Sequence, residues 1–109
     1  MISYLQFMHE KEIERLEKLS REVDSLRCHD YDIDKLDALI KDEWKREFQD
    51  SPPCSRYFNN LKQTKDDELE MLLIHKSRPR LRVSYFESTV RNFKGDISER
   101  ITELKHNSN

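Results

Sequence analysis

The chain has 109 residues, which favours a single domain, and 39% of these residues are charged whereas 35% are hydrophobic. One glycine and three prolines are too few turn residues for an all-β protein with many hairpins. The formal net charge of −2 and the isoelectric point near 6.1 argue against a protein coated with cations for nucleic acid, although they leave room for a local basic patch.

The apolar residues are few for a self-contained core, because a chain of this size buries only about two-thirds of its unfolded surface. Long helices that share a narrow seam, or a partner that completes the core, suit this composition. We expect an ordered chain rather than disorder, because the apolar residues are periodic and include many aromatic side chains.

The longest apolar run, residues 71–74, is too short to cross a membrane, and the first residues lack the pattern of a signal peptide. Cys28 and Cys54 are too few to form a disulfide framework. These features predict an intracellular protein, cytoplasmic or nuclear, with reduced thiols.

The first predicted helix covers residues 2–28. Its apolar residues recur at intervals typical of a coiled-coil seam: Ile2, Leu5, Leu16, Leu19, Val23 and Leu26. His9 and Glu12 interrupt this seam. We interpret His9 as an edge residue, and a polar residue that sets the register of a coiled coil is the alternative.

The second predicted helix covers residues 33–49, and Asp30 or Asp32 can cap its start. Its apolar stripe repeats at three and four: Ile33, Leu36, Ile40, Trp44 and Phe48. We expect Trp44 to pack in the core. The alternative is an anchor at an interface, where tryptophan contributes strongly to binding.

Two shorter helices are predicted over residues 53–63 and 65–76. Ser51 and Pro52 fit an N-cap followed by proline at the first helical position. Several apolar side chains are expected to point inward: Tyr57, Phe58, Leu61, Leu69, Leu72 and Leu73. A single helix over 53–76 is the alternative.

An extended connector is predicted over residues 77–83, because Pro79 disfavours helical geometry at Arg78. Polar and apolar residues alternate over 80–86, which is also the pattern of an edge strand. The connector is the leading interpretation and the strand is the alternative.

The last predicted helix covers residues 84–106, because Ser84 and Glu87 have the spacing of a capping box at a helix start. Its apolar stripe is long: Phe86, Val90, Phe93, Ile97, Ile101 and Leu104. Residues 107–109 are expected to form a frayed tail.

Cations alternate through the predicted connector: Lys76, Arg78, Arg80 and Arg82. Three interpretations are open for them. The leading one is a solvated joint that pairs with the acidic first helices, the second is contact with a partner protein, and the third is contact with a phosphate backbone.

Catalysis has little support in the sequence. There is no P-loop, dinucleotide-binding or zinc-protease motif, and a single glycine excludes a glycine-rich phosphate loop. Cys28 and His29 lie near two aspartates, but zinc normally takes four ligands at spacings that this chain does not show. We therefore predict no catalytic residues, no metal site and no cofactor.

The sequence predicts an all-α single domain over residues 1–109, a small helical bundle or antiparallel coiled coil with two long amphipathic terminal helices. The expected function is a non-enzymatic interaction module that self-associates or docks into a larger complex through its seams. The seam residues expected to carry this function are Leu16, Leu19, Val23, Leu26, Trp44, Phe86, Val90, Phe93, Ile97 and Ile101. The alternatives are a nucleic-acid-binding protein that uses residues 76–82, and an acidic inhibitor of viral or mobile-element origin that uses residues 1–50. No membrane or small-molecule partner is expected.

Overall fold

The computed structural model describes residues 3–50 and 55–107 of the chain. The elements are α1 (Tyr4–Asp24), α2 (Asp30–Asp50), α3 (Arg56–Gln63), the π-helical segment η1 (Thr64–Leu69), α4 (Glu70–Ile74) and α5 (Pro79–Asn107). The two described ranges contain no strand. The predicted all-α helical bundle is therefore confirmed, and the edge-strand alternative for residues 80–86 is wrong.

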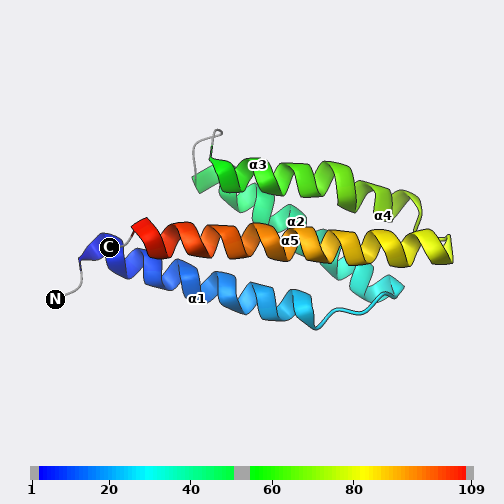
Figure 1. Cartoon of the computed structure of the whole chain (residues 1–109), viewed down its shortest axis with the longest axis horizontal. Helices are drawn as coiled ribbons and strands as arrows, with labels where there is room; N and C mark the ends of the chain where they lie inside the picture. The colour runs from blue at the N-terminus through cyan, green and yellow to red at the C-terminus, as the bar shows by residue number, and fades with distance from the viewer. Residues whose placement is uncertain (1–2, 51–54, 108–109) are drawn as a thin grey trace.

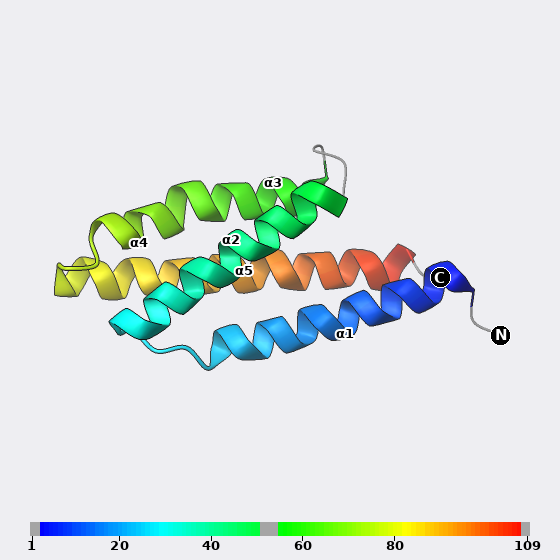
Figure 2. The ribbon, with the colours of Figure 1, turned by 180° about the vertical axis from the view of Figure 1, so that it is seen from behind.

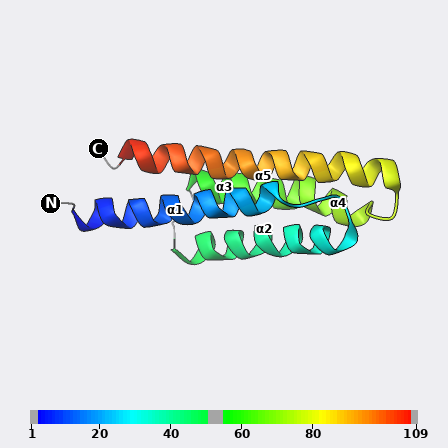
Figure 3. The same ribbon diagram turned by 90° about the horizontal axis from the view of Figure 1, so that it is seen from below.

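The bundle is elongated, with extents of 54 × 27 × 18 Å, and α5 is its central helix. α5 contacts each of the other helical elements. α1 runs antiparallel to α5 along one side, and α3, η1 and α4 follow one another along its other side (Figure 1). α2 crosses α5 obliquely between these two layers (Figure 2). The antiparallel course of α1 and α5 is also visible from below (Figure 3).

Serine side chains cap two of the helices. The Ser3 hydroxyl accepts a hydrogen bond from the Gln6 backbone N–H at 3.1 Å, and the Ser55 hydroxyl accepts one from the Phe58 N–H at 3.0 Å. Both bonds satisfy backbone donors that have no partner in the first turn of a helix. The predicted cap at Ser51 and Pro52 lies outside the described residues.

α1 ends at Asp24, four residues before the predicted boundary, and α2 begins at Asp30. The Asp32 carboxylate accepts a hydrogen bond from the Arg27 backbone N–H at 2.7 Å, which ties the start of α2 to the connecting loop. Although the loop is outside α1, Leu26 is still buried in the core. The apolar seam therefore continues for half a turn beyond the helix that carries it.

The chain is helical without interruption from Arg56 to Ile74, with η1 between α3 and α4, so within the described residues the single-helix alternative is closer to the structure than two separate helices. Both Thr64 and Leu69, the first and last residues of η1, are buried. They are five positions apart, which matches the i→i+5 hydrogen bonding of a π-helix rather than the four of an α-helix. The π-helical segment thus keeps Leu69 facing α5.

The extended connector predicted over residues 77–83 is wrong, because α5 begins at Pro79. The chain turns over 75–78, where the Arg78 N–H donates to the His75 carbonyl at 2.9 Å. The Arg82 N–H then donates to the Arg78 carbonyl at 2.8 Å, as in the first turn of a helix. Proline is well tolerated at the first helical position, since the N–H that it lacks would have no partner there. Pro79 is predicted to prevent a helix, whereas in the structure it is the first residue of one.

The core joins the apolar faces of all the helices. Phe93 and Ile97 of α5 and Tyr57 of α3 are among its most deeply buried side chains. The other buried apolar residues around them are Leu16, Leu19, Val23, Leu26, Ile33, Leu36, Ile40, Phe58, Leu61, Leu69, Leu72, Phe86 and Leu104. The predicted inward residues of the short helices thus lie in this core, except Leu73, which packs against it and is partly exposed.

The position of Ser84 allows a test of where α5 begins. Ser84 is exposed and lies in the helix interior, so Ser84→Ala should leave the free energy of unfolding unchanged or raise it by up to about 0.5 kcal/mol. Ser84→Pro should lower it by about 3 kcal/mol. Urea denaturation measures both values. A loss of about 1 kcal/mol in Ser84→Ala would instead indicate an N-cap and a helix that starts at this residue.

Candidate functional site

The residues predicted to form an interaction seam are used inside the chain. Seven of them are buried in the core: Leu16, Leu19, Val23, Leu26, Phe86, Phe93 and Ile97. The remaining three, Trp44, Val90 and Ile101, are partly buried against this core. A partner that binds without opening the bundle can therefore reach only the exposed parts of Trp44, Val90 and Ile101 among these residues, and its other contacts must be elsewhere.

Large apolar side chains are exposed in three main places. Four of them cluster at the start of α1: Tyr4, Leu5, Phe7 and Met8. Phe48 is exposed near the end of α2, beside the start of α3, and Ile74 is exposed at the far end of α4. Leu81 and Val83 lie on the first turns of α5, and Tyr31 stands alone on the first turn of α2. Clustered apolar side chains on a surface are the features that most often mark binding sites.

Three aromatic rings stack where α2 meets α3. The ring centroids of Trp44 lie 5.8 Å from those of both Phe48 and Phe58, and Phe48 lies 5.9 Å from Phe58. The ammonium of Lys65 lies 4.8 Å from the Trp44 ring. Phe58 is buried, whereas 56% of Phe48 is exposed, so the stack runs from the core to the surface.

A pocket of about 410 Å³ continues from this stack between α2 and the η1–α4 segment. It is lined by Lys41, Lys65, Leu69, Glu70, Leu73 and Ile74. Lys65 borders both the pocket and the Trp44 ring, so the two features form one surface. We call the aromatic stack together with this pocket the aromatic groove.

Lysines surround the aromatic groove. Lys41 pairs with Asp37 at 2.8 Å and Lys65 pairs with Asp66 at 2.7 Å. Lys45 and Lys62 are exposed and form no ion pair with any described residue. Lys45 precedes Phe48 by three residues and Lys62 follows Phe58 by four, so each lies on the same helix face as a ring of the stack. The free cations of this surface are therefore placed to meet acidic groups.

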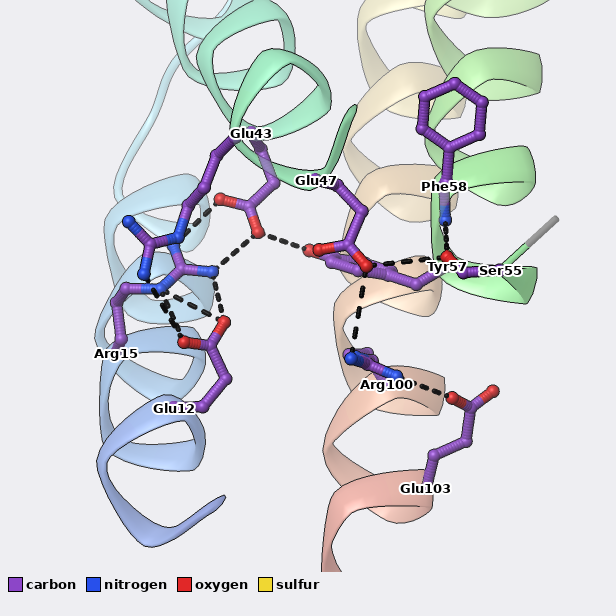
Figure 4. A network of polar contacts seen from close by, with 10 residues as sticks. Glu12, Arg15, Glu43, Glu47, Ser55, Tyr57, Phe58, Arg100 and Glu103 are labelled. Atoms are coloured by element: carbon purple, nitrogen blue, oxygen red, sulfur yellow. Dashed lines mark hydrogen bonds and ion pairs between the residues drawn. The ribbon is translucent and has the colours of Figure 1, made fainter. Parts of the chain in front are cut away.

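A buried charge network fixes the helix that presents Trp44 and Phe48. The guanidinium of Arg15, on α1, donates two parallel hydrogen bonds to the Glu43 carboxylate, at 2.8 and 2.7 Å (Figure 4). The Tyr57 hydroxyl, on α3, donates to the same carboxylate at 2.9 Å. Glu43 is only 4% exposed, so these bonds replace its lost hydration. Burial, together with the adjacent Glu43 charge, raises the pKa of Tyr57 far above its usual range and keeps the hydroxyl protonated.

Glu47, one turn after Glu43, makes the second contact of this kind. Its carboxylate lies 3.9 Å from the Arg100 guanidinium of α5 and accepts a hydrogen bond from the Ser55 hydroxyl at 3.4 Å (Figure 4). Arg100 also pairs with Glu103 at 3.1 Å. The last two turns of α2 are thus held by arginines from α1 and α5.

The roles of Glu43 and Glu47 do not follow from the predicted apolar stripe of the second helix. That stripe continues through Trp44 and Phe48, whereas in the structure the buried face continues through the two glutamates. The two alternatives differ by one residue, or about 100° around the helix. The nearest available signal is that Leu36, Ile40, Glu43 and Glu47 also repeat at four and three. The partners Arg15 and Tyr57 are distant in sequence and could not be assigned from the pattern.

The four cations of the predicted connector have separate environments. Lys76, Arg78 and Arg80 are exposed and make no ion pair with any residue that the structure describes. Arg82 lies 3.7 Å from Asp30 of α2, which is the one pairing with an acidic helix among them in the described ranges. His75 stacks on Tyr85 with ring centroids 5.6 Å apart, which supports the turn that presents these cations.

Metal chemistry has no geometric support in the described part of the chain. Among residues 3–50 and 55–107, no three histidine, cysteine, aspartate or glutamate side chains converge as metal ligands would. Cys28 is half-buried and packs against the core, as a structural cysteine does. In the same ranges, every helix is too short or too polar to cross a membrane.

Comparison with models of known protein families, with curated proteins and with solved structures gives no match. The chemistry of the chain's own surface is therefore the basis for its proposed function.

A polar cleft of about 190 Å³ lies on the other side of the bundle, between the α3–η1 layer and α5. Its lining includes Asp96, whose carboxylate accepts a hydrogen bond from the Thr64 hydroxyl at 2.6 Å. Burial raises the pKa of Asp96 to about 6, although the bond from Thr64 opposes this rise. The folded protein therefore binds this proton more tightly than the unfolded chain does.

The raised pKa of Asp96 predicts a pH-dependent contribution to stability. Because its folded pKa exceeds its unfolded value, this group lowers the free energy of unfolding as the pH rises from about 4 to about 7. Asp96→Asn should remove this pH dependence. At about pH 7 its free energy of unfolding should exceed that of the native chain by about 1–2 kcal/mol. Urea denaturation along the pH series measures it. Thr64→Val should move the dependence to higher pH, and equal pH profiles for native and Asp96→Asn would contradict the prediction.

Proposed function

We propose that this chain is a non-enzymatic interaction module that binds an amphipathic helix of a partner protein in the aromatic groove. The observation that carries the proposal is the stack of Trp44, Phe48 and Phe58, which reaches the surface beside an apolar pocket. Tryptophan and other aromatic residues in well-packed pockets dominate the binding energy of protein interfaces. An intracellular location, cytoplasmic or nuclear, belongs to the same proposal.

The shape of the groove favours a helix as the ligand. Its walls are α2 on one side and the η1–α4 segment on the other. Phe48 is exposed at the end of the groove beside α3, and Ile74 is exposed at the other end. A helix laid into such a groove contributes apolar side chains at intervals of three and four residues. These would pack on the Trp44 and Phe48 rings and on Leu73 in the pocket.

The charges around the groove favour an acidic partner. Lys45 and Lys62 have no acidic neighbour within ion-pair distance among the described residues, and they flank the rings that would bind the apolar face. Complementary charge chiefly sets the rate and the choice of partner rather than the total affinity. The partner helix should therefore carry glutamate or aspartate next to its apolar face.

Two synthetic helical peptides test this proposal. Both have leucine and phenylalanine on one face, and the other face carries glutamate in one peptide and lysine in the second. The acidic peptide should bind more tightly in fluorescence anisotropy. Phe48→Ala and Ile74→Ala should each weaken its binding about tenfold, since each truncates an exposed anchor. Lys45→Glu together with Lys62→Glu should reverse the preference between the peptides.

The matched control is Tyr31→Ala, which removes an exposed aromatic ring from the other end of the same helix. It should leave peptide affinity unchanged. The proposal is wrong if neither peptide binds, or if the groove variants and the Tyr31 variant bind the acidic peptide equally well.

Nucleic-acid binding is the second candidate, and one observation favours it. Lys76, Arg78 and Arg80 are exposed around the turn that starts α5, and none pairs with a described carboxylate. The backbone N–H groups at the start of a helix also favour phosphate. A phosphate backbone is the ligand that such a cluster would attract.

Arg78→Ala combined with Arg80→Ala tests this second candidate. A labelled DNA or RNA duplex at low salt should bind the native chain, and the double variant should bind it less tightly with a shallower salt dependence. Arg91→Ala is the control, because Arg91 is exposed and lies about three turns after the start of α5. Absence of binding by the native chain at low salt would eliminate the idea.

A further inference from the structure

The start of α1 projects past the end of α2. In Figures 1, 2 and 3 the first turns of α1 lie beside the end of α5, whereas α2 and α3 do not reach that far. We call residues 4–8 the α1 overhang. All of its large apolar side chains are exposed: Tyr4, Leu5, Phe7 and Met8.

The α1 overhang continues the face by which α1 packs in the bundle. Leu5 precedes Leu16 by eleven residues, which is three helical turns, so both side chains point to nearly the same side. Leu16 is 0% exposed because it packs in the core, whereas Leu5 is 61% exposed. The same face is therefore left uncovered at its outer end.

A cleft of about 400 Å³ opens next to the α1 overhang, between α1, α2 and α5. Met8 and Leu104 form its apolar part, and its other lining residues are His9, Glu12, Arg46, Glu47 and Arg100. His9, which was predicted to lie at an edge of the seam, is half-buried here, and its Nδ1 atom is buried without a hydrogen-bond partner among the described residues. A projecting apolar surface and a receptive cleft thus lie side by side.

We propose that a second copy of the chain covers the α1 overhang. In the described ranges every other helix already packs on α5, and none of them covers the overhang. In a twofold-symmetric interface the same patch must fit itself, so the projecting and receiving surfaces must be neighbours. The overhang and the cleft meet this condition, because each copy can insert Leu5 and Met8 beside the cleft of the other.

The charges of the cleft are compatible with twofold pairing. Arg46 and Arg100 balance Glu12 and Glu47, so two identical clefts face one another without a net formal charge. Like charges across a symmetry axis would otherwise oppose association. The exposed side chains are aromatic residues, leucine and methionine, and aromatic residues and methionine are enriched at protein interfaces. No lining residue is shared with the aromatic groove, so this proposal is independent of the proposed function.

Sedimentation equilibrium or light scattering, across a series from low to high micromolar concentration, tests the dimer. The mass should rise from 13.3 kDa towards twice that value. Leu5→Glu or Met8→Glu should hold it at the monomer mass and leave the circular dichroism spectrum unchanged, since both side chains are exposed. Leu81→Glu and Val83→Glu, which alter comparably apolar exposed positions on α5, should still dimerise.

A cysteine cross-link locates the interface directly. In a background with Cys28→Ser and Cys54→Ser, a Leu5→Cys chain mixed with an Arg46→Cys chain should form a disulfide-linked dimer on mild oxidation, because Arg46 lines the cleft that receives Leu5 of the other copy. A Leu81→Cys chain mixed with the same Arg46→Cys chain should not. A monomer at every concentration overturns the proposal. So does a dimer that is lost in Phe48→Ala but kept in Leu5→Glu, because the aromatic groove would then be the self-association surface.

Discussion

The hydrogen-bonded pair between Arg15 and Glu43 determines how α2 lies in this bundle. The two parallel bonds need a guanidinium from α1 and a carboxylate from α2 in one plane, and Tyr57 of α3 occupies a remaining acceptor position. Removing one member of a fully buried pair typically costs about 3–5 kcal/mol, because the other charge is left without a partner, and the cost is lower here because 29% of the Arg15 side chain is exposed. The pair, together with the buried side chains of Ile33, Leu36 and Ile40, therefore fixes which face of α2 turns towards the other helices.

The aromatic groove follows from that restriction, and the α1 overhang follows from the length of the same helix. With Glu43 and Glu47 turned inward, Trp44 is only half-buried and Phe48 lies largely in solvent, where they stack on Phe58. α2 also ends at Asp50, so α5 alone lies beside the first turns of α1, and Leu5 stays exposed. The aromatic groove and the α1 overhang are thus two results of the orientation and length of one helix.

Periodicity in the sequence was sufficient to predict the class of fold and most of the core. Leu16, Leu19 and Val23 repeat so regularly that their burial follows from helix geometry alone. Pro79 was misinterpreted because proline disfavours a helix before it and also favours the first turn of one, and local sequence does not separate these effects. The inward turn of Glu43 was not predictable, because its cause is an arginine 28 residues away. The aromatic groove was accordingly less predictable than the fold, because the exposure of Trp44 and Phe48 depends on the orientation of α2.

The π-helical segment η1 has a consequence for changes in chain length. Thr64 and Leu69 are both buried and five residues apart, so η1 contains one residue more than a regular α-helix needs to join the same two positions. The exposed Asp66 lies between them, and its deletion would restore a spacing of four. Elsewhere in a packed helix, the loss of one residue rotates everything that follows by about 100° and brings polar side chains into the core. In η1 the same loss would leave the helix faces before and after it in place, so this is a site at which the layer beside α5 can absorb a one-residue deletion.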